Sequence, residues 1–192
     1  MRYVIFGSGG MAKELIGYGM EVAYVVSTEP LDNPDYEVEV LKKALPGNER
    51  FLLAVADPVI KKKIVMENDD RWSTFIHPSC YISPYAKIGK GCIFAPQAIV
   101  AGDPVIGDFV FFNTNATVGH DTTIGDYSTL FPNSEICGNC SIGDSCLFGI
   151  GSYVLPKCHI PSGSKVSAGA IVRKSLDSAC TVYGDPAKPR AA

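Results

Sequence analysis

The sequence predicts two folds in one chain: a small α/β unit with a parallel sheet over residues 1–75, and an all-β parallel β-helix over residues 76–192. A six-residue repeat predicts the β-helix, and alternating strand and helix patterns around a glycine-rich loop predict the α/β unit. The repeat has precedence over local propensity, because a fixed internal period sets the architecture of the whole segment.

Every sixth residue between positions 76 and 172 is apolar. Apolar residues make up 46% of the chain, so an unbroken column of seventeen is not a chance pattern. Four residues after each of the first sixteen, the side chain is small except at Pro104 and Val110. Six residues suit one short strand and a bend, so we expect three strands per coil, an apolar interior and parallel hydrogen bonds between coils. The apolar column contains Ile76, Ile82, Ile88, Phe94, Val100, Ile106, Phe112, Val118, Ile124, Leu130, Ile136, Ile142, Phe148, Val154, Ile160, Val166 and Val172.

Five of the seven cysteines fall in the small inward column. We expect them to pack as compact apolar side chains with reduced thiols. Cys137 and Cys140 form a C-x-x-C pair, which also fits a redox or zinc motif, but no second pair of zinc ligands accompanies it. The five cysteines of the column are Cys80, Cys92, Cys140, Cys146 and Cys158.

The first 75 residues alternate strand and helix patterns, which favours a parallel sheet half the size of a complete dinucleotide-binding domain. Asp57 is a suitable N-cap for the last helix, and Pro58 suits its first position. Strands are expected at residues 2–6, 22–26, 51–55 and 72–76, and helices from the glycine loop to residue 19, at 39–45 and after residue 57.

The helix after Asp57 is expected to turn Ile60, Ile64 and Val65 toward the core. Its three consecutive lysines at 61–63 are interpreted as a solvated face, with anion binding as the alternative.

The loop after the first strand contains Gly7, Ser8 and Gly9, and with Ala12 it fits the G-x-G-x-x-A fingerprint. Such glycines let backbone N–H groups approach a phosphate at a helix N-terminus. Nicotinamide binding is disfavoured, because the repeats occupy the part of the chain that a second half-sheet needs. A nucleotide-diphosphate site and a purely structural turn both remain open.

Composition excludes several classes of protein. A net charge of −3 and a pI near 5.6 argue against a nucleic-acid partner. The apolar run after Arg2 is too short for a signal peptide, and no segment approaches the ~18 apolar residues of a membrane-spanning helix. We therefore expect a cytoplasmic protein without membrane insertion.

His120 stands two residues after an interior position, so its side chain is expected to point outward. Asp121 follows and can orient or charge-stabilise the imidazole, and histidine can exchange a proton near neutral pH. A general base and an ordinary surface histidine both remain open from these residues alone. His77 and His159 have no comparable neighbours.

The hexapeptide columns, the glycine loop, the Gly119-His120-Asp121 motif and the tail at 184–188 together resemble one family across nearly the whole chain. It is the hexapeptide-repeat acyltransferases of the sialic-acid O-acetyltransferase and nucleotide-amino-sugar N-acetyltransferase type. The resemblance implies a left-handed β-helix, a half-Rossmann N-terminal domain, a homotrimer, and acetyl-CoA held as co-substrate between neighbouring prisms, with no metal.

The resemblance also implies residue roles. His120 is expected to be the general base, Asp121 to raise its basicity, and the N–H of Gly138 to stabilise the oxyanion. Many relatives have His where this chain has Met11 and Thr129. The nucleotide sugar is expected at Gly7, Ser8, Gly9 and Asn113, and acetyl-CoA at Thr129, Gly149, Ile150, Ala168 and Gly169.

The function expected from these residues is acetyl transfer to the amine of a UDP- or other nucleotide-linked 4-amino-4,6-dideoxy sugar. The amine attacks acetyl-CoA directly, because no cysteine is evident as a nucleophile beside His120. Two alternatives remain: O-acetylation of sialic acid or another surface-glycan sugar, and a non-catalytic β-helix that binds nucleotide sugars.

Overall fold

The computed structural model describes residues 2–30 and 39–189. The chain divides into two compact units, Met1–Phe75 and Ile76–Ala192. The parts of the two expected domains at residues 1, 31–38 and 190–192 lie outside the described residues.

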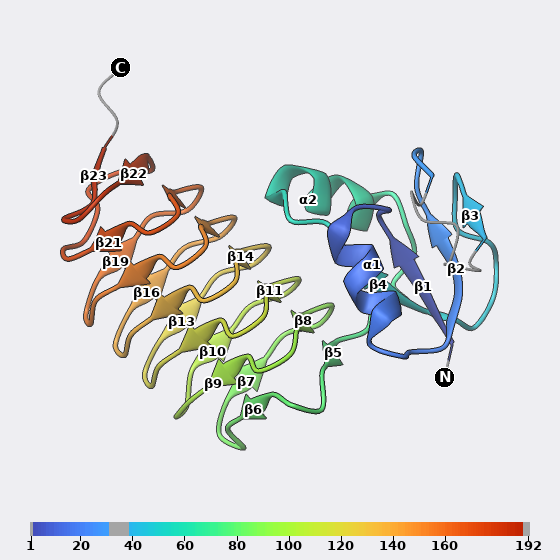
Figure 1. The fold of residues 1–192 in the computed structure, drawn as a ribbon, viewed down its shortest axis with the longest axis horizontal. Helices are drawn as coiled ribbons and strands as arrows, with labels where there is room; N and C mark the ends of the chain where they lie inside the picture. The colour runs from blue at the N-terminus through green and yellow to red at the C-terminus, as the bar shows by residue number, and fades with distance from the viewer. Residues whose placement is uncertain (1, 31–38, 190–192) are drawn as a thin grey trace. The chain divides into compact units, whose positions relative to one another are not determined.

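The first unit is a parallel sheet with two helices (Figure 1). The strand order is β3-β2-β1-β4, and every pairing is parallel. The helix α1 follows β1 and α2 follows β4, and the buried core includes Val4, Ile5, Phe51 and Leu52. The elements are β1 (Tyr3–Phe6), α1 (Gly10–Gly17), β2 (Val22–Val26), β3 (Val40–Leu41), β4 (Arg50–Leu53) and α2 (Pro58–Met66).

Two elements of the first unit differ from the expectation. The segment 39–45 is not a helix, because Val25 and Ser27 donate backbone hydrogen bonds to Glu39 and Leu41 and so recruit this segment as an edge strand. The expected strand at 72–76 is reduced to an isolated bridge between Trp72 and Phe51, followed by the short β5.

The helix α2 begins as expected but buries a different face. Asp57 Oδ1 accepts the N–H groups of Val59 and Ile60 at 2.9 and 3.0 Å. Ile60 is 49% exposed, however, and Lys61 only 1%. The solvated-face interpretation is therefore wrong for Lys61, which lies one turn from the buried Pro58 and packs its aliphatic stem on the same side.

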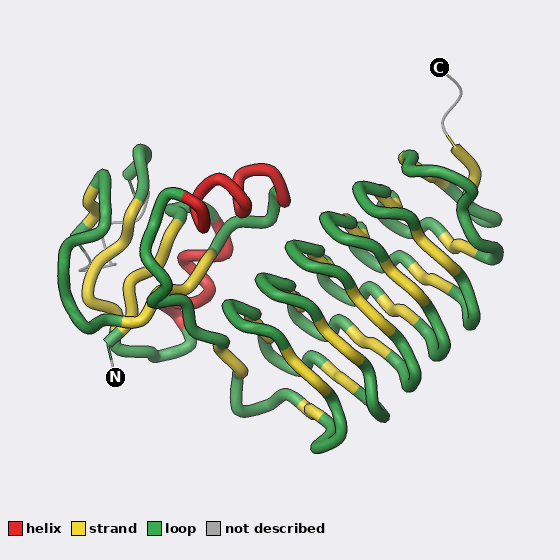
Figure 2. Tube along the Cα trace, turned by 180° about the vertical axis from the view of Figure 1, so that it is seen from behind, coloured by secondary structure: helices red, strands yellow, loops and turns green. Residues whose placement is uncertain are grey.

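The second unit is a β-solenoid of parallel two-residue strands, as the repeat predicts, and Figure 2 shows its stacked coils. Its three faces are separate sheets, in which each strand pairs with the strand 18 residues away.

The first face contains β5 (Phe75–Ile76), β8 (Ile93–Phe94), β11 (Phe111–Phe112), β14 (Thr129–Leu130), β17 (Leu147–Phe148), β20 (Lys165–Val166), β22 (Thr181–Tyr183) and β23 (Lys188–Pro189). The second face contains β6 (Tyr81–Ile82), β9 (Ile99–Val100), β12 (Thr117–Val118), β15 (Glu135–Ile136), β18 (Tyr153–Val154) and β21 (Ile171–Val172). The third face contains β7 (Lys87–Ile88), β10 (Val105–Ile106), β13 (Thr123–Ile124), β16 (Ser141–Ile142) and β19 (His159–Ile160). Only β23 is antiparallel to its neighbour among the described strands of the solenoid.

The apolar column forms the solenoid core. From Phe94 onward its members are at most 3% exposed, and the small residues four positions later are buried beside them. Phe94 and Phe112 stack in successive coils with ring centroids 4.8 Å apart. Ile76 departs from the expectation at 43% exposure, because it begins the repeat and has no preceding coil to cover it.

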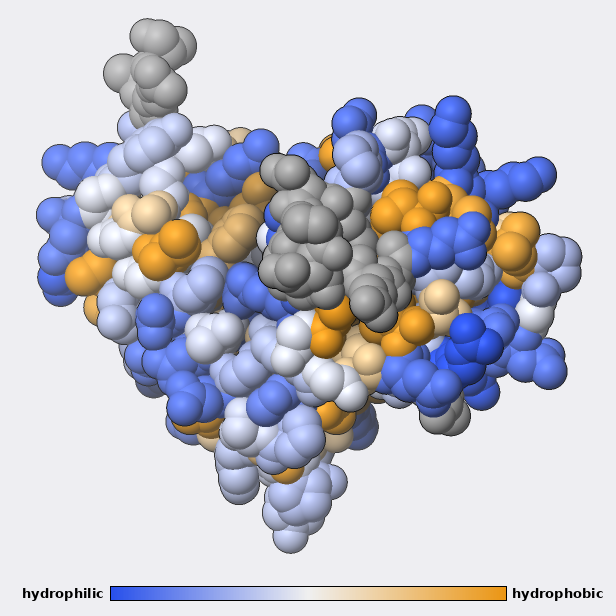
Figure 3. Space-filling model, turned by 45° about the vertical axis from the view of Figure 1, so that its right-hand side comes forward, coloured by the Kyte–Doolittle hydropathy of each residue, from blue (hydrophilic) through white to orange (hydrophobic). Residues whose placement is uncertain are grey.

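Most corners of the solenoid turn through a residue in the left-handed region, the third after each interior position. Nine of these residues are not glycine, with φ between 54° and 65°. This conformation favours Asn and Asp among residues with a Cβ, which fits four of the nine. The nine are Gln97, Phe109, Asn115, Asp121, Tyr127, Asn133, Asn139, Ser145 and Lys157. On the surface, apolar side chains gather in separate patches among polar ones (Figure 3).

The cysteines lead to a first prediction. All seven are free thiols, and four of them are buried: Cys92, Cys140, Cys146 and Cys158. Burial raises the pKa of the Cys146 thiol to about 11. Because the thiolate is the reactive form, roughly 0.1% of such thiols react at any moment at pH 8. An alkylating reagent should therefore modify the four buried cysteines far more slowly than Cys80, Cys137 and Cys180.

Mass spectrometry of the intact protein counts the alkylated thiols over time. The same treatment after unfolding should modify all seven cysteines. Rapid labelling of Cys146 in the folded protein would contradict the packing described above.

Candidate functional site

The three edges of the solenoid carry different residues. The His120 edge lies between the second and third faces and contains corners 101–104, 119–122, 137–140 and 155–158. The Asn113 edge lies between the first and second faces, at 113–116, 131–134, 149–152 and 167–170. The Asp126 edge lies between the third and first faces, at 89–92, 107–110, 125–128, 143–146 and 161–164.

His120 points outward, as expected, with 63% of its side chain exposed. Its Nδ1 lies 2.7 Å from Oδ2 of Asp121. A carboxylate only accepts hydrogen bonds, so Nδ1 donates, and the neutral ring then keeps its lone pair at Nε2. Asp121 is held in turn, because its N–H donates to Oδ1 of Asp103 at 3.1 Å. The pair therefore offers a proton acceptor of fixed orientation.

The imidazole occupies space that two glycines leave free. A Cβ at Gly138 would lie 2.6 Å from His120 Nε2, and a Cβ at Gly102 would lie 2.5 Å from His120 Cβ. The backbone carbonyl of His120 accepts the N–H of Asn139 at 2.9 Å, which fixes the histidine beneath the next coil. Larger residues at either glycine position would displace the ring.

The residues expected to bind acetyl-CoA lie mainly on a different edge. Gly149, Ile150, Ala168 and Gly169 are on the Asn113 edge, and Ile150 is 58% exposed. Asn113 shares this edge but is 7% exposed, and its Oδ1 accepts the N–H of Thr114 at 2.6 Å. Within one chain, these residues are therefore separated from the His120 edge by the second face.

Thr129 lies on neither of these edges. It is the first residue of β14 on the first face, and it is fully buried. The structure thus does not bring it beside His120.

The glycine loop of the first unit borders a cavity of about 500 Å³. Gly7 has φ +111°, and a Cβ there would lie 2.7 Å from the Ala54 carbonyl, so this turn requires glycine. Gly9 has no atom within 4 Å of such a Cβ, and Ser8 Oγ lies 2.8 Å from Ser27 Oγ. The cavity lies at the carboxyl ends of β1, β2 and β4, and its lining includes Gly7, Ser27, Lys42, Lys43, Lys63 and Glu67.

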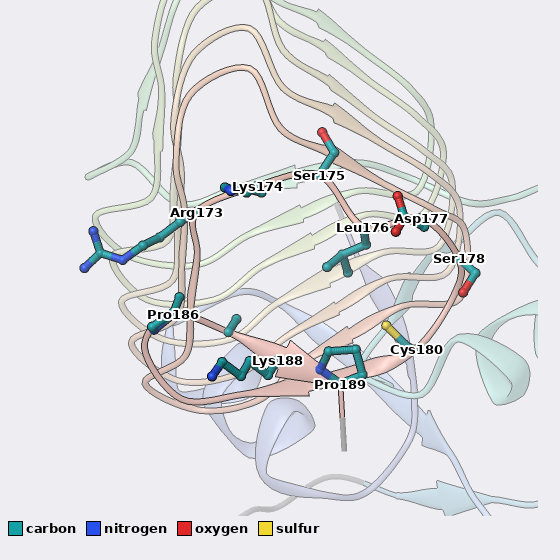
Figure 4. A pocket seen from close by; sticks show the side chains of 11 residues that line it. Arg173, Lys174, Ser175, Leu176, Asp177, Ser178, Cys180, Pro186, Lys188 and Pro189 are labelled. Carbon is teal, nitrogen blue, oxygen red and sulfur yellow. The ribbon is translucent and has the colours of Figure 1, made fainter. Parts of the chain in front are cut away.

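A second cavity, of about 570 Å³, lies at the C-terminal end of the solenoid (Figure 4). Leu176 and Cys180 border it together with Lys174 and Lys188. Arg173 binds Asp185 through two hydrogen bonds, at 2.6 and 2.8 Å, and so fastens the tail to the preceding loop. None of the expected site residues lines this cavity.

Two further searches covered residues 2–30 and 39–189. No group of three or more His, Cys, Asp or Glu side chains in that part could hold a metal ion. No helix there has the length and apolar character to cross a membrane.

Two residues of the His120 edge were missed by sequence reasoning. Asp103 supports Asp121, and Gly102 makes room for His120. Each stands 18 residues before its partner. The stacking period therefore contained the signal, although the sequence motif was interpreted only within its own coil.

No model of a known protein family matches the sequence. Among solved structures, the chain is similar to PerB from Caulobacter crescentus in complex with CoA and GDP-perosamine. The TM-score is 0.91 at 30% identity, and the match covers 100% of this chain and 98% of that one. It is also similar to the acetyltransferase domain of PglB from Neisseria gonorrhoeae, with a TM-score of 0.87, 25% identity and coverages of 98% and 99%.

Among curated proteins, the chain is 30% identical over 92 residues to the bifunctional protein GlmU of Halalkalibacterium halodurans. The match includes 47% of this chain, which spans about a fifth (20%) of the length of that relative.

The structural matches run along the whole chain rather than the repeats alone, and the class they define is an acyltransferase built on a β-solenoid. The chain belongs to the hexapeptide-repeat acyltransferase family.

Proposed function

We propose that this protein transfers the acetyl group of acetyl-CoA to the amine of a nucleotide-linked amino sugar. The observation that carries the proposal is the end-to-end similarity to an N-acetyltransferase solved with CoA and GDP-perosamine, together with an oriented His120–Asp121 pair. The proposal includes the left-handed winding and the nucleotide-sugar-binding role of the first unit, with domains 1–75 and 76–192.

The proposed chemistry needs one base and one oxyanion donor. The sugar amine attacks the thioester carbonyl while Nε2 of His120 takes its proton. The N–H of Gly138 stabilises the oxyanion of the tetrahedral intermediate. The carbon–sulfur bond then breaks, the amide forms, and the CoA thiolate leaves and takes up a proton. Asp121 stabilises the imidazolium through Nδ1.

The positions of the two edges support a homotrimer. The His120 edge and the Asn113 edge flank the same face, the second, whose outward side chains include Tyr81, Ile99 and Tyr153 at 58%, 36% and 39% exposure. In a cyclic trimer with these faces toward the axis, the His120 edge of one copy meets the Asn113 edge of the next. The catalytic pair and the residues assigned to acetyl-CoA then share one cleft, three times per trimer.

The cavity in the first unit supports the assignment of the nucleotide. Ligands of parallel α/β sheets bind at the carboxyl ends of the strands. Lys42, Lys43 and Lys63 line this cavity and supply positive charge for a diphosphate. This extends the role expected for Gly7, Ser8 and Gly9. Since acetyl-CoA and nucleotide sugars are metabolites of the cytoplasm, the proposal retains a cytoplasmic location.

The experiment measures CoA release with acetyl-CoA and a panel of nucleotide-linked amino sugars, with free sialic acid as the comparison. Activity confined to the nucleotide-linked amines is the expected result. Release with sialic acid alone would favour O-acetylation. No release with any acceptor would leave a binding protein.

The variant Lys63→Gln tests the cavity in the same assay. Loss of a charge-assisted hydrogen bond to phosphate should raise KM for the nucleotide sugar by about 10-fold to 100-fold. The KM for acetyl-CoA should be unchanged. Lys62→Gln is the matched control, because the neighbouring Lys62 does not line the cavity. Equal effects of the two substitutions would contradict a phosphate contact at Lys63.

A further inference from the structure

The Asp126 edge follows a regular hydrogen-bonding rule. At each corner, the N–H of the second residue donates to the side chain that stands 18 residues later. The four bonds run from Lys90 to Asp108, from Asp108 to Asp126, from Asp126 to Asp144 and from Asp144 to Ser162, at 2.8 to 3.0 Å. A side-chain oxygen in the next coil thus pairs an N–H that the parallel ladder leaves unused.

The His120 edge has the same corner geometry. Lys157 has φ 65° and donates its N–H to the Gly138 carbonyl at 3.1 Å. The equivalent Ser145 has φ 59° and donates to the Asp126 carbonyl at 2.7 Å. A side chain at position 156 therefore stands over the N–H of Gly138 as Asp144 stands over that of Asp126.

The acceptor is missing at this edge. Pro156 follows Gly138 by one coil, and its ring offers no hydrogen-bond acceptor. Among the described residues, the N–H of Gly138 donates no hydrogen bond, although Gly138 is buried. Buried N–H groups without a partner are rare, and such a group needs an explanation. The unpaired N–H lies against the catalytic ring, because Gly138 contacts His120 Nε2 and Cε1.

We propose that Pro156 is a positioning residue that keeps the Gly138 N–H unpaired and available to the oxyanion. This inference rests on the proposed function. A side-chain oxygen at position 156 would occupy the N–H permanently, as it does along the Asp126 edge. Proline excludes this competing hydrogen bond and fixes its own φ near the value of the corner.

The test compares Pro156→Asp with Pro156→Ala. Aspartate supplies the missing acceptor, so kcat should fall by about 10²-fold to 10³-fold, the effect of losing one oxyanion donor. The KM values for both substrates should stay within a few-fold. Alanine supplies no acceptor and should retain kcat within a few-fold. An equally slow Pro156→Ala would mean that the proline matters only for the shape of the corner.

Amide hydrogen exchange tests the hydrogen bond without any substrate. Exchange at Gly138 should be slower in Pro156→Asp than in the wild type by about 5-fold to 10-fold, as expected for one net hydrogen bond. Asp144→Ala is the matched control on the Asp126 edge. It should release the N–H of Asp126 and leave kcat unchanged.

The two measurements separate the possible failures. Slower exchange with an unchanged kcat would overturn the oxyanion role of Gly138. Unchanged exchange would overturn the claim that position 156 controls this N–H. A wild-type protein without transferase activity would sink the proposed function, while the exchange result would still report on Pro156.

Discussion

His120→Ala should lower kcat by about 10²-fold to 10⁴-fold, the usual contribution of a general base. Nε2 of His120 is the proton acceptor, and the Asp121 carboxylate at Nδ1 sets its orientation. The variant should bind acetyl-CoA and the sugar normally, because the ring contributes to proton transfer and not to holding either substrate. Steady-state rates of CoA release, with KM for each substrate, measure the effect.

His159→Ala is the matched control for this variant. His159 is an exposed histidine at the start of β19, and it lies on the third face rather than on the His120 edge. Its removal should leave kcat within a few-fold. Comparable losses in both variants, or a His120→Ala rate within a few-fold of wild type, would contradict the proposed base.

The same variant also tests whether the site is shared between copies. Ala168→Trp should block the Asn113 edge and inactivate the enzyme separately, because Ala168 is exposed there. In a trimer, co-expression of the two inactive variants creates some clefts with both edges intact, so activity should return in part. A site contained in one chain would give no recovery.

Phe112→Ala should destabilise the solenoid by about 3–5 kcal/mol, the typical cost of removing a buried aromatic side chain. Phe112 is fully buried and stacks on Phe94 at 4.8 Å. Each coil is supported by its neighbours only, so the cavity weakens the interfaces on both sides. Chemical denaturation at a fixed protein concentration measures the change.

Two comparisons make this result specific to the core. Phe112→Leu retains most of the volume and should cost less than about 1.5 kcal/mol. Val105→Ala truncates an outward residue that is 44% exposed, and surface substitutions of this kind usually stay within about 0.5 kcal/mol. A Phe112→Ala variant as stable as Val105→Ala would contradict the inward packing of the column.

The solenoid could be predicted from the sequence because its determinants are local and repeated. Each interior residue, from Phe94 to Val172, has the same environment in every coil, so seventeen weak signals add to one strong one. The phase of the column also predicted that His120 points outward and that Cys92, Cys140, Cys146 and Cys158 are buried.

The first unit was less predictable, because tertiary contacts decide its ambiguous segments. Val40 and Leu41 form a strand only since β2 offers a free edge, and no local pattern announces this. Lys61 is buried although its two neighbours are solvent-exposed lysines. A charged side chain with a long aliphatic stem can satisfy either environment, so composition alone does not decide.

The candidate site was predicted in part from one coil and in part from the family resemblance. The His120–Asp121 pair follows from adjacent residues, but Gly102, Asp103 and Pro156 act from other coils. The distribution of the expected residues over two edges also required the structure, since distance along the sequence does not say which corner a residue occupies. The roles of Gly149, Ile150, Ala168 and Gly169 toward acetyl-CoA remain predictions.

The stacking at intervals of 18 residues restricts which length changes the gene of such a protein can tolerate. An inserted or deleted hexad would continue the apolar column and leave the core intact. It would nevertheless rotate every later residue onto the next edge, so Gly138 would no longer stand beside His120. Only the gain or loss of a complete coil, at a point outside corners 101–158, keeps the catalytic column in alignment. Duplication of single hexads is therefore compatible with folding and incompatible with catalysis.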